Sequence, residues 1–282
     1  MSSNSAAWLT SPKTRPLEVK SAPLWTATTN EILIKNHAIA INPMLQGEVI
    51  KGGPNATRFK PGDRVVGHAL GMATKRLQIP DDIAFEIAAV LPLGLSTAAC
   101  GLFQKDYLDL GYPTEPRAGD TGKVVLVWGG ASSVGSNAIQ LAVAAGYEVL
   151  TTASLKNFGY VKNLGAVAVF DYNSRTAVED LVTALKGKRL AGALDYVVFQ
   201  SEGEKVVATT KAGFQAAEGV TVKMIFGTRK AIYGDFLPKA LQAKSFIPVP
   251  QPLVAGKGLE RVQGAVDLLA KGVSARKVVV TL

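Results

Sequence analysis

The stretch that points most directly to chemistry is a glycine-rich turn, Gly130-x-Ser132-x-x-Gly135. It follows the apolar run 123–128, which is typical of a strand buried on both faces, and it precedes an alanine-rich helix expected at 137–145. Glycines in this context allow a tight turn and close approach of the backbone to a pyrophosphate, while the helix N-terminus attracts anions. The pattern predicts a dinucleotide-binding site made by Gly130, Ser132, Ser133, Val134 and Gly135. The alternative is a turn that only joins a strand to a helix.

The end of the next expected strand, 147–152, favours NADP(H) over NAD(H). An NAD-binding fold places Asp or Glu about 20 residues beyond the glycines, where it holds the ribose hydroxyls. No acid stands there in this chain, and Ser154, Lys156 and Asn157 offer hydrogen-bond donors and a positive charge, as a 2′-phosphate requires. Capping of the following helix by Ser154 is the competing explanation, and the two roles can coexist.

The composition argues against a metal site and a nucleic-acid surface. The chain has 282 residues, 48% of them hydrophobic, which suits a globular protein with a sizeable core. A single cysteine, Cys100, and two histidines, His37 and His68, cannot build a disulfide or a Cys/His zinc cage. The formal net charge of +9 is spread along the chain and forms no basic stripe. We therefore expect neither a metal nor a nucleic acid as ligand.

The most apolar stretch, 84–103, is expected to be a buried helix and not a membrane span. It contains Glu86 and Pro92, which would be costly in lipid. Residues 1–20 lack the apolar segment of a signal peptide. The lone thiol is compatible with a reducing compartment, so a cytoplasmic protein without a membrane partner is expected.

Two patterns of elements divide the chain. Residues 1–80 contain short strands between glycine and proline turns, typical of a small barrel or sandwich. After the Pro/Gly-rich stretch 111–122, strands and helices alternate, which predicts an α/β fold of the Rossmann type with a doubly wound parallel sheet. A helix at 259–271 and a strand at 277–282 complete the pattern.

Several motifs in order carry a resemblance to a known family. They are Ala40-Ile-Asn-Pro43, Arg58-Phe-Lys-Pro-Gly-Asp-Arg-Val65, Ala89-Val-Leu-Pro-Leu93 with Ser96-Thr97, the turn at 129–135, Phe170-Asp-Tyr172 and Val222-Lys-Met-Ile-Phe-Gly227. With these motifs the chain resembles zinc-independent medium-chain dehydrogenases/reductases of the quinone oxidoreductase and enoyl reductase branch, above all fungal trans-acting enoyl reductases. The resemblance implies a β-rich GroES-like domain at 1–115 and 246–282, and an NADP(H)-binding Rossmann domain at 116–245.

The resemblance also implies roles for individual residues. Tyr172 corresponds to a tyrosine near the adenosine 2′-phosphate, and Phe226-Gly227 to the loop over the nicotinamide. Thr97 corresponds to a residue near the nicotinamide and Asn42 to one on the substrate side of the cleft, so both are expected at the catalytic centre. Without the resemblance, Thr97 and Phe226 would be interpreted as core residues and Asn42 as a turn residue.

The family resemblance implies hydride transfer from NADPH to an activated C=C bond, without a metal. An enone, a quinone, or a small-molecule or carrier-bound enoyl compound would be the substrate. The chain is nevertheless shorter than its family: after Asn42 the usual strand and glycine-rich segment are expected to be missing, and 70–79 is expected to be only a short link. The alternative is therefore a shortened homologue that binds NADP(H) without efficient turnover, or a scaffold for a partner enzyme.

A third shortening concerns the parallel sheet. Strands are expected at 193–199 and from residue 205, and only the five residues 200–204 join them. Parallel neighbours need a crossover of about a dozen residues or more, so an antiparallel or irregular pair is expected here. The apolar Val197 and Phe199 would then need another cover, which suggests a possible homodimer.

The scarcity of metal ligands gives a first testable expectation. Protein purified without added chelator should contain clearly less than one zinc per chain, because the side chains for a Cys/His site are lacking. Elemental analysis measures the zinc content, and an activity assay with and without chelator provides the control. One tightly bound zinc per chain would contradict this expectation.

Overall fold

The computed structural model describes residues 3–12, 14–41, 44–70, 73–194, 206–209, 221–225 and 232–282. The chain forms two compact units: unit 1 comprises Met1–Pro92 and Gln251–Leu282, and unit 2 comprises Leu93–Pro250. The sequence boundaries were expected after 115 and 245. The first division falls earlier because helix α2 (Leu91–Phe103) packs on the sheet of unit 2, where Gly101 closely approaches Leu194.

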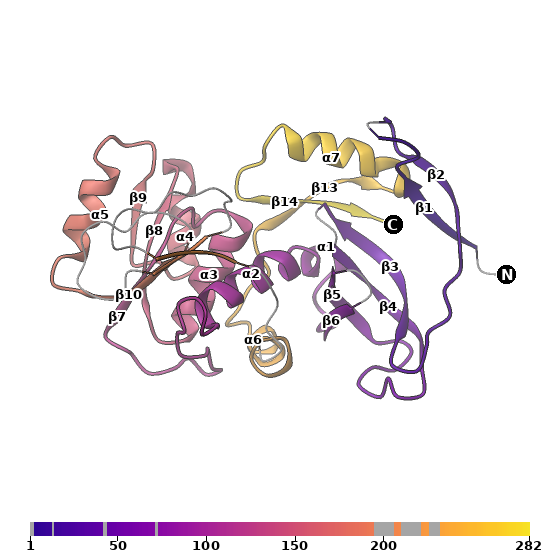
Figure 1. Ribbon diagram of the computed structural model, residues 1–282, viewed down its shortest axis with the longest axis horizontal. Helices are drawn as coiled ribbons and strands as arrows, with labels where there is room; N and C mark the ends of the chain where they lie inside the picture. The colour runs from indigo at the N-terminus through magenta and orange to yellow at the C-terminus, as the bar shows by residue number, and fades with distance from the viewer. Residues whose placement is uncertain are drawn as a thin grey trace. The chain divides into compact units, whose positions relative to one another are not determined.

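Unit 2 is built on a six-stranded sheet in which every neighbouring pair is parallel (Figure 1). The strand order is β12-β11-β10-β7-β8-β9. The strands are β7 (Lys123–Val127), β8 (Glu148–Ala153), β9 (Ala168–Asp171), β10 (Arg189–Leu194), β11 (Val206–Thr209) and β12 (Thr221–Met224). This order confirms the doubly wound sheet that the alternating elements predict.

Helices pack on the sheet of unit 2. Helix α5 (Ala177–Leu185) packs through Leu181 and Leu185 on a buried cluster that includes Val124 and Leu126 of β7. Side chains alternate along a strand, so Val125 and Val127 face the opposite side, and both are fully buried there. The remaining helical segments of this unit are α3 (Ser133–Ala144), α4 (Phe158–Asn163) and α6 (Leu237–Gln242), with short turns η1 (Leu155–Asn157) and η2 (Ile232–Phe236).

The pairing of β10 with β11 shows that the expectation of an antiparallel or irregular pair was wrong. The strands are parallel, with Ala193 opposite Val207, and β10 begins at Arg189, four residues earlier than expected. Eleven residues, 195–205, separate it from β11 in the sequence. A stretch of that length reaches at most about 40 Å, whereas a six-residue strand spans only about 20 Å. A parallel return is therefore possible. Val197 and Phe199 lie outside the described residues, so the possible homodimer that would cover them stays a prediction.

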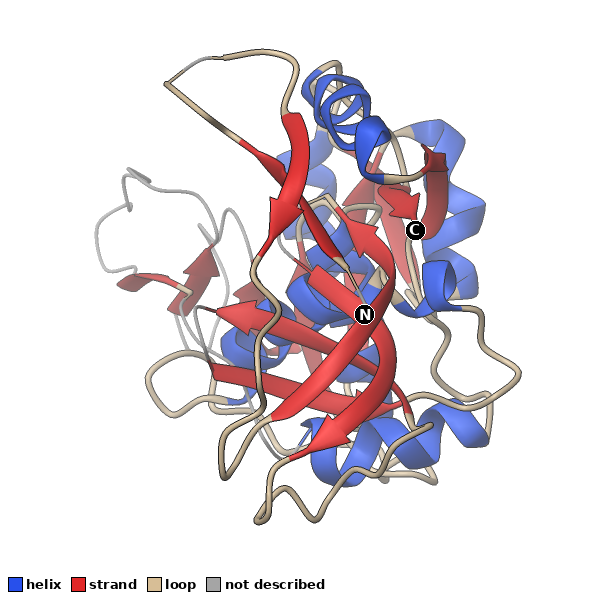
Figure 2. Ribbon diagram, turned by 90° about the vertical axis from the view of Figure 1, so that its right-hand side faces the viewer, coloured by secondary structure: helices blue, strands red, loops and turns tan. Residues whose placement is uncertain are grey.

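Unit 1 contains a second six-stranded sheet, in the order β13-β14-β3-β4-β5-β6. Figure 2 shows several of its strands as long, strongly curved arrows. The pairs from β14 to β6 are antiparallel, and β13 runs parallel to β14. The strands are β3 (Ile32–Ala40), β4 (Met44–Gly52), β5 (Arg64–Leu70), β6 (Ala73–Gln78), β13 (Gln251–Lys257) and β14 (Arg276–Thr281), and β1 (Asn4–Trp8) pairs separately with β2 (Glu18–Ala22).

Two strands of this sheet lie where the sequence predicts losses. The expectation of only a short link at 70–79 was wrong, because β6 lies there. The loss of a family strand and a glycine-rich segment after Asn42 stays a prediction. β4 directly follows Asn42-Pro43 and pairs with β3 and β5, while β6 occupies the supposed short link and pairs with β5. Gly47 interrupts the apolar pattern of β4, and β6 consists mainly of polar residues. Neither strand therefore shows the alternation by which strands are recognised; backbone pairing with their neighbours defines them instead.

Two helices and a loop complete unit 1. Helix α7 (Val262–Ala270), preceded by η3 (Leu259–Arg261), packs through Ala265 on Val278 and Val280 of β14 (Figure 1). Arg15, between β1 and β2, forms an ion pair with Asp267 of α7 at 2.9 Å. The short helix α1 (Phe85–Ala88) places the ring of Phe85 against that of His37, with 4.6 Å between the ring centroids.

The apolar stretch behaves as a buried element. Phe85–Phe103 is the one helical span within the described residues that is long and apolar enough to cross a membrane. However, 72% of its apolar window is buried within the fold. This burial agrees with the expected core helix.

The close packing of α2 on α3 gives a prediction for stability. A Cβ on Gly94 would lie 2.3 Å from the carbonyl oxygen of Ser133, so a side chain must push the helices apart. We expect Gly94→Ala to lower the free energy of unfolding by about 1–3 kcal/mol, measured by chemical denaturation. The control is Gly159→Ala in α4, where an added Cβ meets no atom within 4 Å. This substitution should raise the free energy of unfolding by about 0.5–1 kcal/mol. A Gly94→Ala protein as stable as the parent would contradict the close approach.

Candidate functional site

The glycine-rich turn lies at the carboxyl end of β7, where the order of the strands reverses. From β7 the chain continues to β8 and β9 on one side, and then to β10, β11 and β12 on the other. In open parallel sheets, ligands bind beyond the carboxyl ends of the strands at such a switch point. The N–H of Trp128, directly after β7, donates to the carbonyl oxygen of Leu194 at 3.0 Å, which joins β7 to β10 at this position.

The backbone of the turn leaves no space for side chains at two of its glycines. A Cβ on Gly135 would lie 2.3 Å from the carbonyl oxygen of Gly129 and 2.8 Å from Cα of Gly130. A Cβ on Gly130 would lie 2.3 Å from Oγ1 of Thr151. Gly129 has a φ of +71°, a conformation that favours glycine. Tight turning and close helix–strand packing are the roles that glycines have in a dinucleotide-binding turn.

Ser132 caps helix α3 where the sequence predicts a pyrophosphate. Its Oγ accepts a hydrogen bond from the backbone N–H of Gly135 at 3.0 Å. The N–H groups of Ser133 and Val134 belong to the first turn, so no helical carbonyl lies one turn back to accept from them. Together with the helix dipole they form an end that suits an anion. The first turn carries no acidic residue that would repel a phosphate.

Two buried threonines of β8, which the sequence analysis missed, hold the turn in place. Oγ1 of Thr152 accepts from the N–H of Gly129 at 2.9 Å, and its carbonyl oxygen accepts from the N–H of Gly130 at 2.9 Å. Oγ1 of Thr151 donates to the carbonyl oxygen of Val127 at 2.6 Å. A signal was present in the sequence: two adjacent hydroxyl residues lie in the second half of the strand, and buried polar side chains need hydrogen-bond partners.

A second set of hydroxyls, also missed, reaches the turn from the helices. Oγ of Ser136, on α3, lies 2.7 Å from the carbonyl oxygen of Ser132 and 3.0 Å from that of Gly130. The hydroxyl of Tyr160, on α4, donates to Oγ of Ser136 at 2.9 Å. No motif connects Ser136 with Tyr160 in the sequence, because their contact depends on how α4 packs beside α3.

Ser154 and Tyr172 follow neighbouring strands at the same edge of the sheet. β8 and β9 pair with Ala153 opposite Asp171, so the two predicted residues come directly after paired positions. The side chain of Tyr172 is 45% exposed and can therefore contact a ligand. The structure thus brings together the two strand ends from which the sequence predicts contacts to a 2′-phosphate.

The side chain of Ser154 does not cap the helical turn that follows β8, and its contact with a phosphate stays a prediction. Ser154 occupies the N-cap position of η1 without a capping bond, and its Oγ instead accepts from Nδ2 of Asn157 at 3.1 Å. Lys156 is exposed beside them. The acid of β8, Glu148, lies at the opposite end of the strand, where it pairs with Lys188 at 2.6 Å. The carboxyl end of β8 therefore carries no acid of its own.

Thr97 is half-buried on α2, near the start of α3. It follows Gly94 by three residues, and residues with this spacing share a helix face; Gly94 packs against Ser133. The neighbouring Ser96 is buried and forms a hydrogen bond with the hydroxyl of Tyr233 at 2.8 Å. Burial raises the pKa of Tyr233, so this phenol remains protonated. The structure places Thr97 beside the helix that carries the turn, and its catalytic role stays a prediction.

Three predicted site residues, Asn42, Phe226 and Gly227, lie outside the described residues, so their roles also stay predictions. The structure assembles the part of the site expected for pyrophosphate and adenosine. Its members are Gly130, Ser132, Ser133, Val134, Gly135, Ser154, Lys156, Asn157 and Tyr172.

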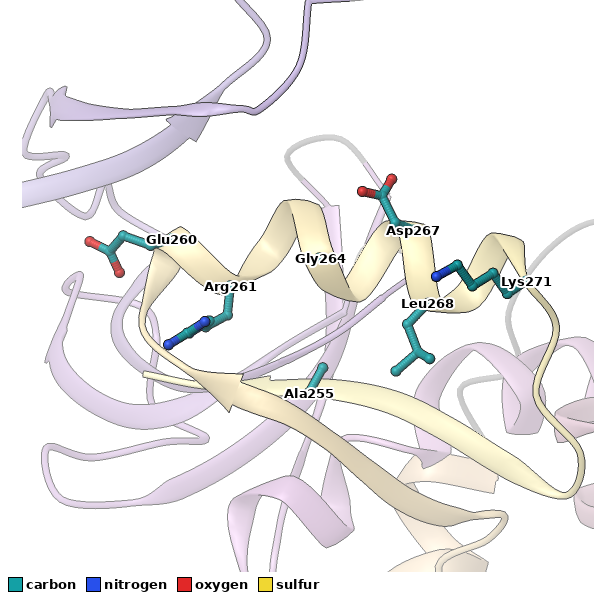
Figure 3. Close-up of a pocket in the computed structure, with 7 residues that line it drawn as sticks. All are labelled: Ala255, Glu260, Arg261, Gly264, Asp267, Leu268 and Lys271. Atoms are coloured by element: carbon teal, nitrogen blue, oxygen red, sulfur yellow. The ribbon is translucent and has the colours of Figure 1, made fainter.

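Other parts of the described chain offer no rival centre that combines such features. Within the described ranges, no group of three or more His, Cys, Asp or Glu side chains could hold a metal ion. A pocket of about 500 Å³ lies along α7 in unit 1 (Figure 3). Leu268 points from α7 toward the strand that carries Ala255, and Asp267 is already paired with Arg15. The pocket contains none of the predicted site residues.

Comparisons with known proteins agree with this geometry, although no family model matches the chain. The chain is 52% identical to the zinc-binding alcohol dehydrogenase domain-containing protein cipB of Emericella nidulans, over 99% of this chain and 98% of that protein. It is 32% identical to the trans-enoyl reductase himH of Aspergillus japonicus, over 99% and 97%. The crystal structure of CurK enoyl reductase has the same fold, with a TM-score of 0.76 at 18% identity over 98% of both chains.

The comparison with cipB also confirms that internal segments are missing. The match spans 335 positions, and this chain has 282 residues, so at least 53 positions of the span have no counterpart here. A parallel sheet with its glycine-rich turn at the switch point, a separate β-rich sheet and full-length similarity to fungal oxidoreductases lead to one assignment. The chain belongs to the medium-chain dehydrogenase/reductase superfamily, among its fungal dehydrogenases and trans-enoyl reductases.

Proposed function

We propose that the protein is an NADPH-dependent reductase that transfers hydride to an activated C=C bond of an enoyl, enone or quinone substrate. The observation that supports this proposal best is a pair of anion-binding features at one edge of the parallel sheet. One is the N-terminus of α3, with its first-turn N–H groups and the close backbone approach at Gly135. The other is the exposed Lys156 between Ser154 and Asn157, beside the strand end that carries Tyr172.

In this proposal the chain's residues bind and orient the cofactor. The N–H groups of Ser133 and Val134 hold the pyrophosphate, while Ser154, Lys156 and Tyr172 hold the 2′-phosphate. When bound, NADPH supplies the hydride and becomes NADP⁺; an enoyl or enone substrate gains the hydride at the β-carbon and a proton, from solvent or from a tyrosine, at the α-carbon. Precise orientation is what the protein contributes to such a reaction. The relation to trans-enoyl reductases favours an enoyl compound, free or carrier-bound, over a quinone.

The missing internal segments motivate a second candidate function. With at least 53 positions of its relative absent, the chain could hold NADP(H) through unit 2 without efficient turnover. Turnover assays with a panel of enones, quinones and enoyl thioesters, run beside a binding titration, distinguish the two functions. NADPH binding without oxidation of NADPH by any substrate would favour the second.

The absence of an acid at the end of β8 gives a prediction for cofactor choice. NADPH should bind at least tenfold more tightly than NADH, because a charge-assisted contact to the 2′-phosphate contributes roughly 1.5–3 kcal/mol. Isothermal titration calorimetry gives both dissociation constants. Lys156→Gln should weaken the binding of NADPH and leave the binding of NADH unchanged. Equal constants for the two cofactors in the parent protein would contradict a 2′-phosphate site.

The close approach at Gly135 gives a prediction for binding itself. Gly135→Val should weaken dinucleotide binding at least tenfold, which corresponds to about 1.4 kcal/mol, because its Cβ would meet the carbonyl oxygen of Gly129 at 2.3 Å. Circular dichroism checks that the variant is folded, and Gly159→Ala serves as the glycine control. Undiminished affinity in a folded Gly135→Val protein would mean that the turn only connects two elements.

A further inference from the structure

We propose that Tyr160 is a positioning residue for the dinucleotide, which acts through Ser136 to fix the pyrophosphate-binding turn. This inference rests on the proposed function, because it assumes that the N-terminus of α3 receives a pyrophosphate. Neither residue belongs to the glycine-rich motif, yet both contribute hydroxyls to it.

The direction of the hydrogen bonds carries the argument. Oγ of Ser136 is within reach of two backbone carbonyl oxygens of the turn, those of Ser132 and Gly130, at 2.7 and 3.0 Å. A serine hydroxyl has one hydrogen to donate and lone pairs to accept with. Tyr160 donates its own hydrogen to Oγ of Ser136 at 2.9 Å. The hydrogen of Ser136 is therefore left for the carbonyl oxygens of the turn.

Burial makes this arrangement persistent. Ser136 is fully buried, so water cannot replace Tyr160 as its donor. The phenol of Tyr160 is half-buried, and this burial raises its pKa. The hydroxyl therefore stays protonated, and remains a donor, throughout the neutral range.

The position of Tyr160 in the chain connects two parts of the proposed site. Helix α4, which carries Tyr160, begins directly after η1, the short turn that contains Lys156 and Asn157. The contact with Ser136 thus joins the segment proposed for the 2′-phosphate to the turn proposed for the pyrophosphate. If the hydroxyl of Tyr160 only needed a partner in the core, any buried acceptor would serve. Its acceptor is Ser136, whose own hydroxyl contacts the turn.

Another tyrosine in unit 2 supplies the matched control. The hydroxyl of Tyr147 accepts a hydrogen bond from the N–H of Gly111 at 3.1 Å. Tyr147 precedes β8, whereas the turn is bonded to Thr152 near the other end of that strand. Tyr147→Phe and Tyr160→Phe both remove one phenolic hydroxyl with one hydrogen bond. Only the second removes a group connected to the turn through Ser136.

The experiment measures dissociation constants of NADPH and of adenosine 2′-monophosphate, which has a 2′-phosphate but no pyrophosphate. The proteins are the parent, Tyr160→Phe, Ser136→Ala, the double variant and Tyr147→Phe. We expect Tyr160→Phe to raise the dissociation constant of NADPH about three- to tenfold, as the loss of one hydrogen bond does. The dissociation constant of adenosine 2′-monophosphate should not change. The double variant should bind NADPH as Ser136→Ala does, because Tyr160 acts through Ser136. Tyr147→Phe should bind both ligands like the parent.

Three outcomes would overturn the inference. They are NADPH binding by Tyr160→Phe at parental strength, an equal weakening of both ligands, and additive effects of the two substitutions. Failure of the parent protein to bind NADPH at all would instead refute the proposed function. NADPH binding by the parent protein therefore distinguishes a failure of this inference from a failure of the proposed function.

Discussion

The candidate site depends on the distance at which the first turn of α3 meets the backbone after β7. Gly135 lies so close to Gly129 and Gly130 that no side chain fits between them. This approach places the start of a buried helix directly above the carboxyl edge of the sheet, where the strand order reverses. Several other contacts of the site maintain this approach. Ser132 caps the helix, and the threonines of β8 hold the turn from below.

Much of this half of the molecule could be predicted from local sequence. A continuous apolar strand, a glycine turn and an alanine-rich helix are consecutive, so their pattern alone indicates a binding turn. The missing acid after β8 is equally local. The contact of Tyr160 with Ser136 could not be predicted, because 24 residues separate the two side chains and only the packing of α4 brings them together. Asn42, Phe226 and Gly227 were assigned by family resemblance, and the described residues do not test them.

The errors in the sheets have a common physical cause. Periodicity identifies a strand through the side chains that it buries, so β4, interrupted by Gly47, and the polar β6 escaped notice. β10 was expected at 193–199 but lies at Arg189–Leu194, so its start was placed four residues and its end five residues too late. The late end made the connection to β11 seem too short for a parallel pair. Backbone hydrogen bonds between strands, which leave little trace in a sequence, decided all three cases.

The order of strands in unit 1 has a consequence for synthesis on the ribosome. All of unit 2 has been made once Pro250 has been added, whereas β14, which lies between β13 and β3, is made only with residues 276–281. Domains generally fold as units while the chain grows from its N-terminus. The glycine-rich turn can thus form on a nascent chain in which β3 has β4 beside it but still lacks its second neighbour, β14. Until β14 is made, the edge of β3 that faces away from β4 exposes hydrogen-bonding groups of the kind that promote aggregation.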